Sequence, residues 1–217
     1  MPATIITTAQ QKGGAGKTTL AAHLAIAWVG SGKRVAIVDI DPQASLATWF
    51  EMRAGNLAGA SMAGGKGSLT HHAIGGWRVA GKVTELARDH DIVLIDSPPH
   101  ADTEARFAIA AADLVVIPVQ PSPMDLWASK ATIALAAAEK TPAMLVFNRV
   151  PPRAKLNDIM ARAAKDLGAP IAKTGIGNRV TLAASMVDGL GVTEAEPRSR
   201  AAAEITALAR EVLKRAG

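Results

Sequence analysis

A glycine-rich loop near the N-terminus is the feature that most restricts what this chain can fold into. Residues 11–19 read Gln-Lys-Gly-Gly-Ala-Gly-Lys-Thr-Thr, between a β-prone run at 4–8 and an Ala- and Leu-rich, helix-like run at 20–29. Strand, glycine loop and helix in this order form the context in which such a loop binds phosphate. The glycines let backbone N–H groups turn inward around an anion, and the helix start adds free N–H groups and its positive dipole end.

The residue types in this loop have distinct expected roles. Lys17 would reach the β- and γ-phosphates of a nucleotide, and the Thr18 hydroxyl would ligate Mg²⁺. The other residues expected to line the phosphates are Gly13, Gly14, Ala15, Gly16 and Thr19. The alternative is a glycine-rich turn with solvated lysines, which the flanking strand and helix patterns disfavour.

Length and composition indicate the class of protein to which this loop belongs. The 217 residues are enough for one domain, 1–217, with a substantial core, and their 49% hydrophobic content is that of a globular protein. Cysteine is absent, which removes disulfides, thiolate metal sites and iron–sulfur clusters. No apolar stretch approaches the roughly 20 residues that span a bilayer, and the N-terminus lacks the pattern of a signal peptide. We therefore expect a cytoplasmic protein.

The formal net charge of +5 is distributed unevenly along the chain. Residues 1–148 hold 12 Lys and Arg against 12 Asp and Glu, whereas residues 149–217 hold 12 against 7. An excess confined to the last third suggests an anionic partner such as DNA or a membrane surface. A solvated basic face with no partner explains the same charge equally well.

Three aspartates follow apolar runs that have the pattern of buried strands. Asp39 and Asp41 come after the run 35–38, and Asp96 ends the run 92–95. Because a strand–helix–strand unit of this kind is parallel, the carboxyl ends of these strands should meet beside the phosphate loop. Asp96 has the form of a Walker B aspartate, which holds Mg²⁺, usually through a water. For Asp41, the alternative is that it and the following proline merely start a turn.

The remaining chain alternates between helical and strand-like segments. Helices are expected at 44–53, 82–88, 102–112, 124–140, 154–167, 180–186 and 197–215, and strands at 114–119, 143–147 and around 171. The glycine-rich stretch 54–76 is expected to be a mobile surface excursion with a short edge strand at 69–71. Met124 and Trp127 are assigned to the core.

Motifs along most of the chain resemble those of the ParA/MinD family of dimerising ATPases. The standard G-x-x-x-x-G-K-[ST] loop needs glycine at position 11, where this chain has Gln11, and Lys12 instead stands at the loop start, as in the deviant Walker A loop of that family. The resemblance also covers the segments 39–43, 95–99, 117–118, 148–149 and 189–194. It implies a mainly parallel, twisted β-sheet flanked by helices, the α/β fold of P-loop NTPases. Because the first strand begins at residue 4, short ParA-like partition ATPases are the nearer match.

The resemblance also assigns roles to single residues. It implies that Asp41 orients the attacking water, that Asp39 supports the Mg²⁺ shell, and that Lys12 crosses to the phosphates of a second subunit like an arginine finger. Asn148, with Arg149 beside it, would recognise adenine, although asparagine is also a routine turn residue. The candidate catalytic residues are thus Lys12, Lys17 and Asp41, and the candidate Mg²⁺ ligands are Thr18, Asp39 and Asp96.

The function that this resemblance implies is that of an ATP-dependent switch. With ATP and Mg²⁺ the protein would form a homodimer, bind DNA without sequence preference, and release it on hydrolysis. It would associate with the nucleoid, position a plasmid, chromosome or protein cluster, and respond to a partner protein that stimulates its ATPase, ParB-like or an adaptor. The candidates for DNA contact are Arg149, Arg153, Lys155, Arg179, Arg198, Arg200, Lys214 and Arg215.

Two other functions of the same fold stay open. An ATP-dependent small-molecule synthetase or kinase, resembling dethiobiotin synthetase, would bind an acceptor in the pocket and would need neither Lys12 nor a basic C-terminal third. A MinD-like membrane switch would need a C-terminal amphipathic helix with apolar residues outside the core. The bulky apolar residues of the last helix are Ile205, Leu208, Val212 and Leu213. Their spacing predicts a stripe that faces the core, so membrane binding is not expected.

Overall fold

The computed structural model describes residues 2–57, 67–99, 102–152, 160, 162 and 164–217. Within these residues, six strands form one sheet in the order β3-β2-β4-β1-β5-β6, and every neighbouring pair is parallel. The strands are β1 (Thr4–Thr8), β2 (Arg34–Asp39), β3 (Ser68–Ala73), β4 (Ile92–Asp96), β5 (Leu114–Val119) and β6 (Ala143–Phe147). β1, which leads into the glycine loop, lies between β4 and β5, so the loop leaves from the middle of the sheet.

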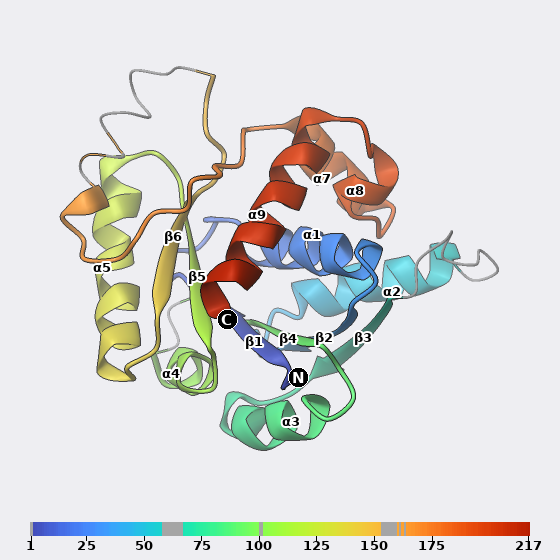
Figure 1. Cartoon of the computed structure of the whole chain (residues 1–217), viewed down its shortest axis with the longest axis horizontal. Coiled ribbons are helices and arrows are strands. Elements are labelled where there is room, and N and C mark those ends of the chain that lie inside the picture. Colours follow the sequence, from blue (N-terminus) through green and yellow to red (C-terminus); the bar gives the residue numbers. More distant parts are fainter. Residues whose placement is uncertain (1, 58–66, 100–101, 153–159, 161, 163) are drawn as a thin grey trace.

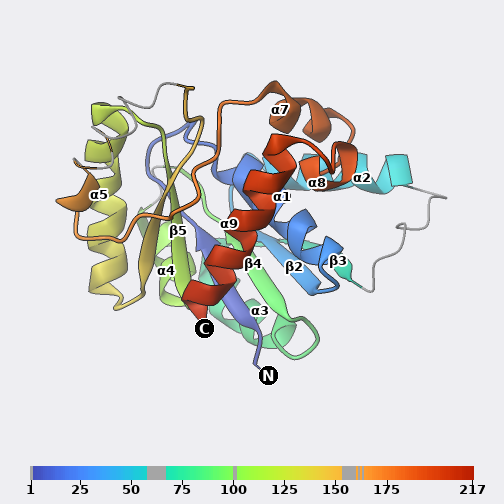
Figure 2. The same cartoon turned by 45° about the horizontal axis from the view of Figure 1, so that its top comes forward.

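Helices cover both faces of this sheet, which gives three layers (Figure 1). On one face are α1 (Lys17–Gly30), α2 (Ser45–Leu57), α7 (Val180–Val187), α8 (Val192–Ala195) and α9 (Arg200–Ala216). On the other are the 3-10 turn η1 (Gly76–Arg78), α3 (Val79–Leu86), α4 (Asp102–Ala110) and α5 (Pro123–Ala138). The turned view in Figure 2 shows α9 lying across the sheet beside α1.

β2, β4, β5 and β6 are apolar along most of their length because their side chains alternate between two buried layers. In β5, Leu114 and Val116 belong to the core under α1 and α9, whereas Val115 and Ile117 belong to the core on the α5 side. A parallel sheet that is covered on both faces requires this continuous apolar pattern. The predicted α/β fold, a mainly parallel sheet flanked by helices, is therefore confirmed.

Several predicted elements differ from the observed ones at their ends. The edge strand expected at 69–71 is β3, which spans Ser68–Ala73 and pairs with β2. The last helix begins at Arg200 because the Ser199 side chain caps it, accepting the Ala202 N–H at 3.1 Å. The strand expected around 171 is a single parallel bridge between Leu145 and Ile171. Most of the helix expected at 154–167, and residues 58–66 of the glycine-rich stretch, lie outside the described residues.

The apolar stripe of α9 is part of the core. Ile205, Leu208 and Val212 are fully buried, and Leu213 packs against the same cluster. The Trp28 indole N–H donates to the Ala209 carbonyl at 3.0 Å, which ties α1 to α9. In the part of the chain that the structure describes, no helix is long and apolar enough to cross a membrane.

The assignment of Met124 and Trp127 to the core is wrong. Their exposed fractions are 63% and 61%. Both lie in the first turns of α5, which buries Leu126, Ser129 and Thr132 instead. α5 carries small and apolar residues on all its sides, so the sequence pattern did not show which side packs against the sheet.

Candidate nucleotide-binding site

The glycine loop, residues 9–16, joins β1 to α1 at the carboxyl edge of the sheet. Gly14 and Gly16 have φ angles of 76° and 90°, which residues with a side chain rarely adopt. A Cβ on Gly16 would also lie 2.5 Å from Asn148 Nδ2. Gly16 is the N-cap of α1 and offers no side-chain acceptor to the first N–H groups of the helix. These groups are therefore available to an anion, as the sequence predicts for a phosphate loop.

Lys17 is the first residue of α1 and lies beside two carboxylates. Only 6% of Lys17 is exposed. Burial lowers the pKa of its ammonium group, and attraction from Asp96 and Asp41 works against that shift. A buried cation at the mouth of the loop is suited to pair with the phosphates of a nucleotide.

Asp96 lies at the centre of the site, at the end of β4 and in register with Thr8 of β1 and Asp39 of β2. It accepts hydrogen bonds from Thr18 Oγ1 at 2.7 Å and from Thr8 Oγ1 at 3.0 Å. Burial raises the pKa of the Asp96 carboxyl to about 7, although both hydroxyl bonds favour its charged form. A buried carboxylate beside a threonine hydroxyl would gain from a divalent cation, so the pair fits the predicted Mg²⁺ ligands.

The other two predicted carboxylates shape the turn after β2. Asp39 is buried and accepts the Asp41 N–H at 3.0 Å and the Ala47 N–H at 3.1 Å. Asp41 is partly exposed, and its Oδ1 accepts the Gln43 N–H at 2.9 Å, which is the turn expected of an Asp-Pro pair. Among the described residues, no three His, Cys, Asp or Glu side chains group closely enough to hold a metal. Mg²⁺ at Thr18 and Asp96 would therefore also need oxygens from phosphates and water.

Asn148 contacts the loop itself. It is buried after β6, its Nδ2 donates to the Ala15 carbonyl at 2.9 Å, and its Oδ1 accepts the Arg149 N–H at 3.0 Å. Arg149 has a φ of 54°, in the left-handed region. Both ends of the Asn148 amide are thus used inside the protein, and its Nδ2 ties the end of β6 to the loop. Its recognition of adenine stays a prediction.

Lys12 is held against α5. Its Nζ lies 2.6 Å from Asp125 Oδ2, and the exposed fractions of the two side chains are 41% and 4%. The sequence did not indicate Asp125, and it also missed Gln120 and Thr132. Gln120 Nε2 donates to the Gly14 carbonyl at 3.1 Å, and Thr132 Oγ1 accepts the Gln11 N–H at 3.3 Å. Gln120 directly follows a strand, which was a usable signal, whereas only the fold places Thr132 at the loop.

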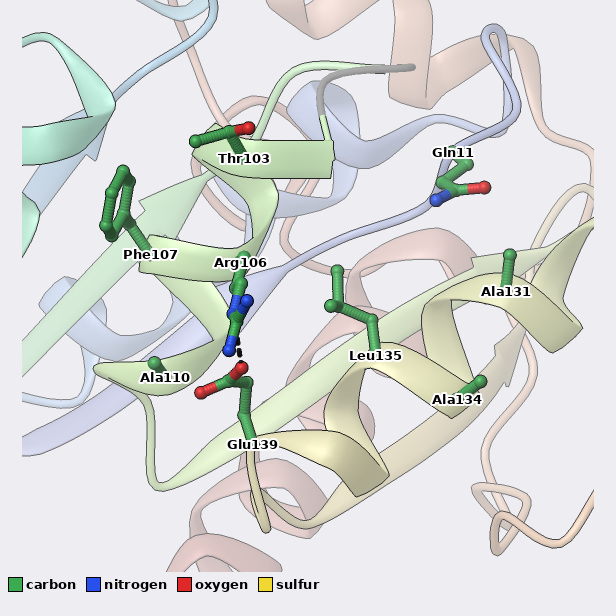
Figure 3. Close-up of a pocket in the computed structure, with 9 residues that line it drawn as sticks. All are labelled: Gln11, Thr103, Arg106, Phe107, Ala110, Ala131, Ala134, Leu135 and Glu139. Carbon is green, nitrogen blue, oxygen red and sulfur yellow. Dashed lines mark hydrogen bonds and ion pairs between the residues drawn. The ribbon is translucent and has the colours of Figure 1, made fainter.

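A groove of about 860 Å³ lies between α4 and α5, beside the loop (Figure 3). Phe107 and Leu135 contribute apolar surface, Arg106 pairs with Glu139, and Gln11 marks the end nearest the loop. None of the residues predicted to contact phosphate lines it. The groove is therefore a neighbour of the predicted nucleotide site.

The central strand, the glycine loop, the lysine and threonine at the helix start, and the aspartate that ends the adjacent strand define the class: a P-loop nucleotide-binding protein of the α/β type. The family follows from comparison with known proteins. The model of the CobQ/CobB/MinD/ParA nucleotide binding domain matches residues 6–192. This chain belongs to that family and is a ParA/MinD-family ATPase, which confirms the resemblance stated from the motifs.

Individual relatives support the same assignment. Maintenance of carboxysome distribution protein A of Halothiobacillus neapolitanus is 32% identical over 213 residues, which cover 94% of each chain. The chromosome-partitioning ATPase Soj of Thermus thermophilus is 36% identical over 134 residues, 53% of this chain and 54% of Soj.

Solved structures share the fold at low identity. MinD of Pyrococcus horikoshii complexed with Mg-ADP has a TM-score of 0.78 at 20% identity, covering 99% of this chain and 98% of that one. A point variant of Cyanothece McdA in complex with ATP has a TM-score of 0.77 at 19% identity, covering 98% and 96%. The pNOB8 ParA bound to nonspecific DNA has a TM-score of 0.67 at 18% identity, covering 98% of each chain.

Proposed function

We propose that this protein is a ParA-like partition ATPase that dimerises on ATP, binds DNA without sequence preference, and releases it on hydrolysis to position a cargo. The observation that carries the proposal is that the loop has an additional lysine, Lys12, besides Lys17. Lys17 is buried beside Asp96, where its own subunit can use it, whereas the Lys12 side chain is 41% exposed and lies against Asp125 of α5. A single active site needs only one such lysine, so the other is suited to reach a second subunit.

The surface beside Lys12 supports a face-to-face dimer. Met124 and Trp127, both more than half exposed, flank Asp125, the residue that Lys12 contacts. Large apolar side chains gathered at an exposed site are typical of the centre of a protein interface. A second copy that covered this face would bury them and bring its own loop opposite the first.

We assign the site residues as follows. Lys17, Thr19 and the backbone of Gly13, Gly14, Ala15 and Gly16 bind the phosphates, with Thr18, Asp39 and Asp96 around Mg²⁺. When bound, Mg²⁺ neutralises phosphate charge. Asp41, which is partly exposed at the site, orients the attacking water, Lys12 stabilises charge across the dimer, and Asn148 and Arg149 lie at the base.

The candidate DNA-contacting residues differ in whether they are already ion-paired or exposed to solvent. Arg179 and Arg200 both pair with Glu204, at 2.6 and 3.2 Å. Arg149, Arg198, Lys214 and Arg215 are exposed, and the remaining candidates Arg153 and Lys155 lie outside the described residues. Doubling such a surface in a dimer raises DNA affinity steeply, because each phosphate contact releases counterions. We therefore place the ATP-bound protein on the nucleoid.

For the cargo, we favour a protein cluster over a plasmid or chromosome. The relative that matches 94% of both chains is named for carboxysome distribution, whereas the match to the chromosome-partitioning Soj covers about half of each chain. We infer a partner protein of the adaptor kind that links the cargo to the ATPase and stimulates hydrolysis.

One observation favours a second candidate function. The groove between α4 and α5 adjoins the loop at Gln11 and is large enough for a small acceptor molecule, as an ATP-dependent synthetase or kinase requires. A MinD-like membrane switch has less support, since the apolar stripe of α9 is buried in the core.

Sedimentation with ATP, with ADP and without nucleotide tests the proposal, repeated with DNA at several salt concentrations. We expect a dimer with ATP alone, and DNA binding by that dimer. Lys12→Ala should bind ATP but fail to dimerise, and Asp41→Ala should accumulate as an ATP dimer that still binds DNA. Full ATP turnover by a monomer, unaffected by Lys12→Ala and dependent on a metabolite, would favour the synthetase instead.

A further inference from the structure

His71 of β3 lies beside one of the predicted carboxylates of the site. In the pairing of β3 with β2, His71 is opposite Ile37, and the residue opposite Asp39 is Ala73. Because side chains alternate along a strand, His71 and Asp39 point to the same face of the sheet, the one that α1 and α2 cover. The imidazole Nε2 lies 3.9 Å from Asp39 Oδ2, and the exposed fractions of the two side chains are 11% and 1%.

The orientation of the His71 ring is set by α2. The ring of Phe50 stacks on the imidazole, with 5.3 Å between the centroids and 25° between the planes. The Nε2 atom is buried and has no hydrogen-bond partner among the described residues, which is an unfavourable state for a polar atom. Since the carboxylate of Asp39 can only accept, we expect the nitrogen that faces it to carry the ring proton.

Asp39 in turn determines where Asp41 lies. Its Oδ1 accepts the Asp41 N–H at 3.0 Å, and its Oδ2 accepts the N–H of Ala47, in the first turn of α2, at 3.1 Å. One carboxylate therefore holds both ends of the segment 41–47. A group that orients Asp39 also orients Asp41.

We propose that His71 is a positioning residue for hydrolysis: its Nε2–H closes on Asp39 when nucleotide binds and, through that carboxylate, fixes the turn that carries Asp41. The separation of 3.9 Å is longer than a hydrogen bond, and contacts at such sites often tighten only in the complex with substrate. The inference rests on the proposed function, in which Asp41 orients the attacking water. It adds a residue that acts on Asp41 only through Asp39.

Two substitutions separate the N–H of His71 from its ring. His71→Phe keeps an aromatic ring to stack on Phe50 but has no N–H, whereas His71→Gln loses the ring and keeps an amide N–H. We expect the kcat of ATP hydrolysis to fall roughly tenfold in His71→Phe, with KM for ATP within about twofold, and to stay within about threefold of wild type in His71→Gln. Stability in urea should follow the opposite order, with His71→Gln the less stable. Equal losses of kcat in the two variants, or none in His71→Phe, would overturn the proposal.

A second measurement does not depend on turnover. In the full chain with ADP and Mg²⁺, hydrogen exchange at the Asp41 and Ala47 amides, read by NMR, should be roughly fivefold faster in His71→Phe than in wild type, because both amides donate to Asp39. His72→Phe is the matched control, since His72 points to the opposite face of β3, with its Nε2 3.2 Å from Thr70 Oγ1, and should leave both rates unchanged.

The two measurements also distinguish this inference from the proposed function. Unchanged exchange in His71→Phe would contradict the link between His71 and Asp39, whatever the ATPase rate. If the wild-type chain hydrolyses no ATP, the proposed function fails, and faster exchange in His71→Phe would still support that link.

Discussion

Gly16 shows how strongly single positions of the site are constrained. Its φ of 90° strains any residue with a side chain, and a Cβ there would collide with Asn148 Nδ2, which holds the Ala15 carbonyl. Lys17 follows directly, so the conformation of one glycine places the first turn of α1 and the lysine together. The conformation of the loop is therefore determined by its own backbone and by Asn148, which follows β6.

Gly16→Ala is expected to lower the free energy of unfolding of the nucleotide-free protein by about 1–3 kcal/mol, because it combines left-handed strain with a collision. Gly13→Ala is the matched control in the same loop. Gly13 has open space around its Cβ position and is not among the glycines with positive φ. Urea unfolding measures both, and equal stability of the two variants would show that Asn148 and the loop adjust freely.

Among the elements, three helices are joined by His23. Its Nδ1 accepts the Val192 N–H of α8 at 3.1 Å, so the ring proton lies on Nε2, which donates to the Leu182 carbonyl of α7 at 3.0 Å. His23 itself is buried in α1. Burial lowers its pKa to about 4, although the Leu182 bond works against that shift. The neutral ring therefore stabilises the attachment of α7 and α8 to α1.

This contact predicts a loss of stability in acid. The unfolded His23 takes up a proton below its usual pKa of about 6.5, whereas the folded one does so only near 4. Because the unfolded state then binds more protons, stability should fall as the pH drops from about 6.5 towards 4. Between pH 7.5 and pH 5, wild type should lose about 2 kcal/mol more than His23→Gln in urea unfolding. Equal losses would mean that the buried ring titrates normally.

Across the molecule as a whole, the two ends of α9 lie at opposite edges of the sheet. α9 runs from the side of α7 and α8 to the C-terminus, which lies beside the N-terminus and hence at the amino edge of β1 (Figure 1). Arg198 precedes the start of α9, whereas Lys214 and Arg215 belong to its last turn. A dimer that meets at the phosphate loops would bring the Arg198 ends near each other and leave the other ends apart.

DNA binding that depends on the dimer should therefore depend more on Arg198 than on Lys214. For Arg198→Ala we expect the negative slope of log K against log salt to become shallower by about 1.8, since each of two subunits would lose one phosphate contact worth about 0.9. Lys214→Ala is the control and should change the slope little. Fluorescence anisotropy of the ATP-bound protein on duplex DNA measures both, and a larger effect of Lys214→Ala would place the DNA at the amino edge.

Local patterns in the chain were enough to predict the glycine loop, the parallel strands and the aspartate that ends β4, because glycine spacing and continuous apolar runs are local properties. Three features emerged only from the folded arrangement: the pairing of Lys12 with Asp125, the contact of Asn148 with Ala15, and the exposure of Met124 and Trp127. The first two contacts join residues 113 and 133 positions apart. Such contacts depend on which strands become neighbours and on which side of α5 packs against the sheet, and no local pattern encodes either.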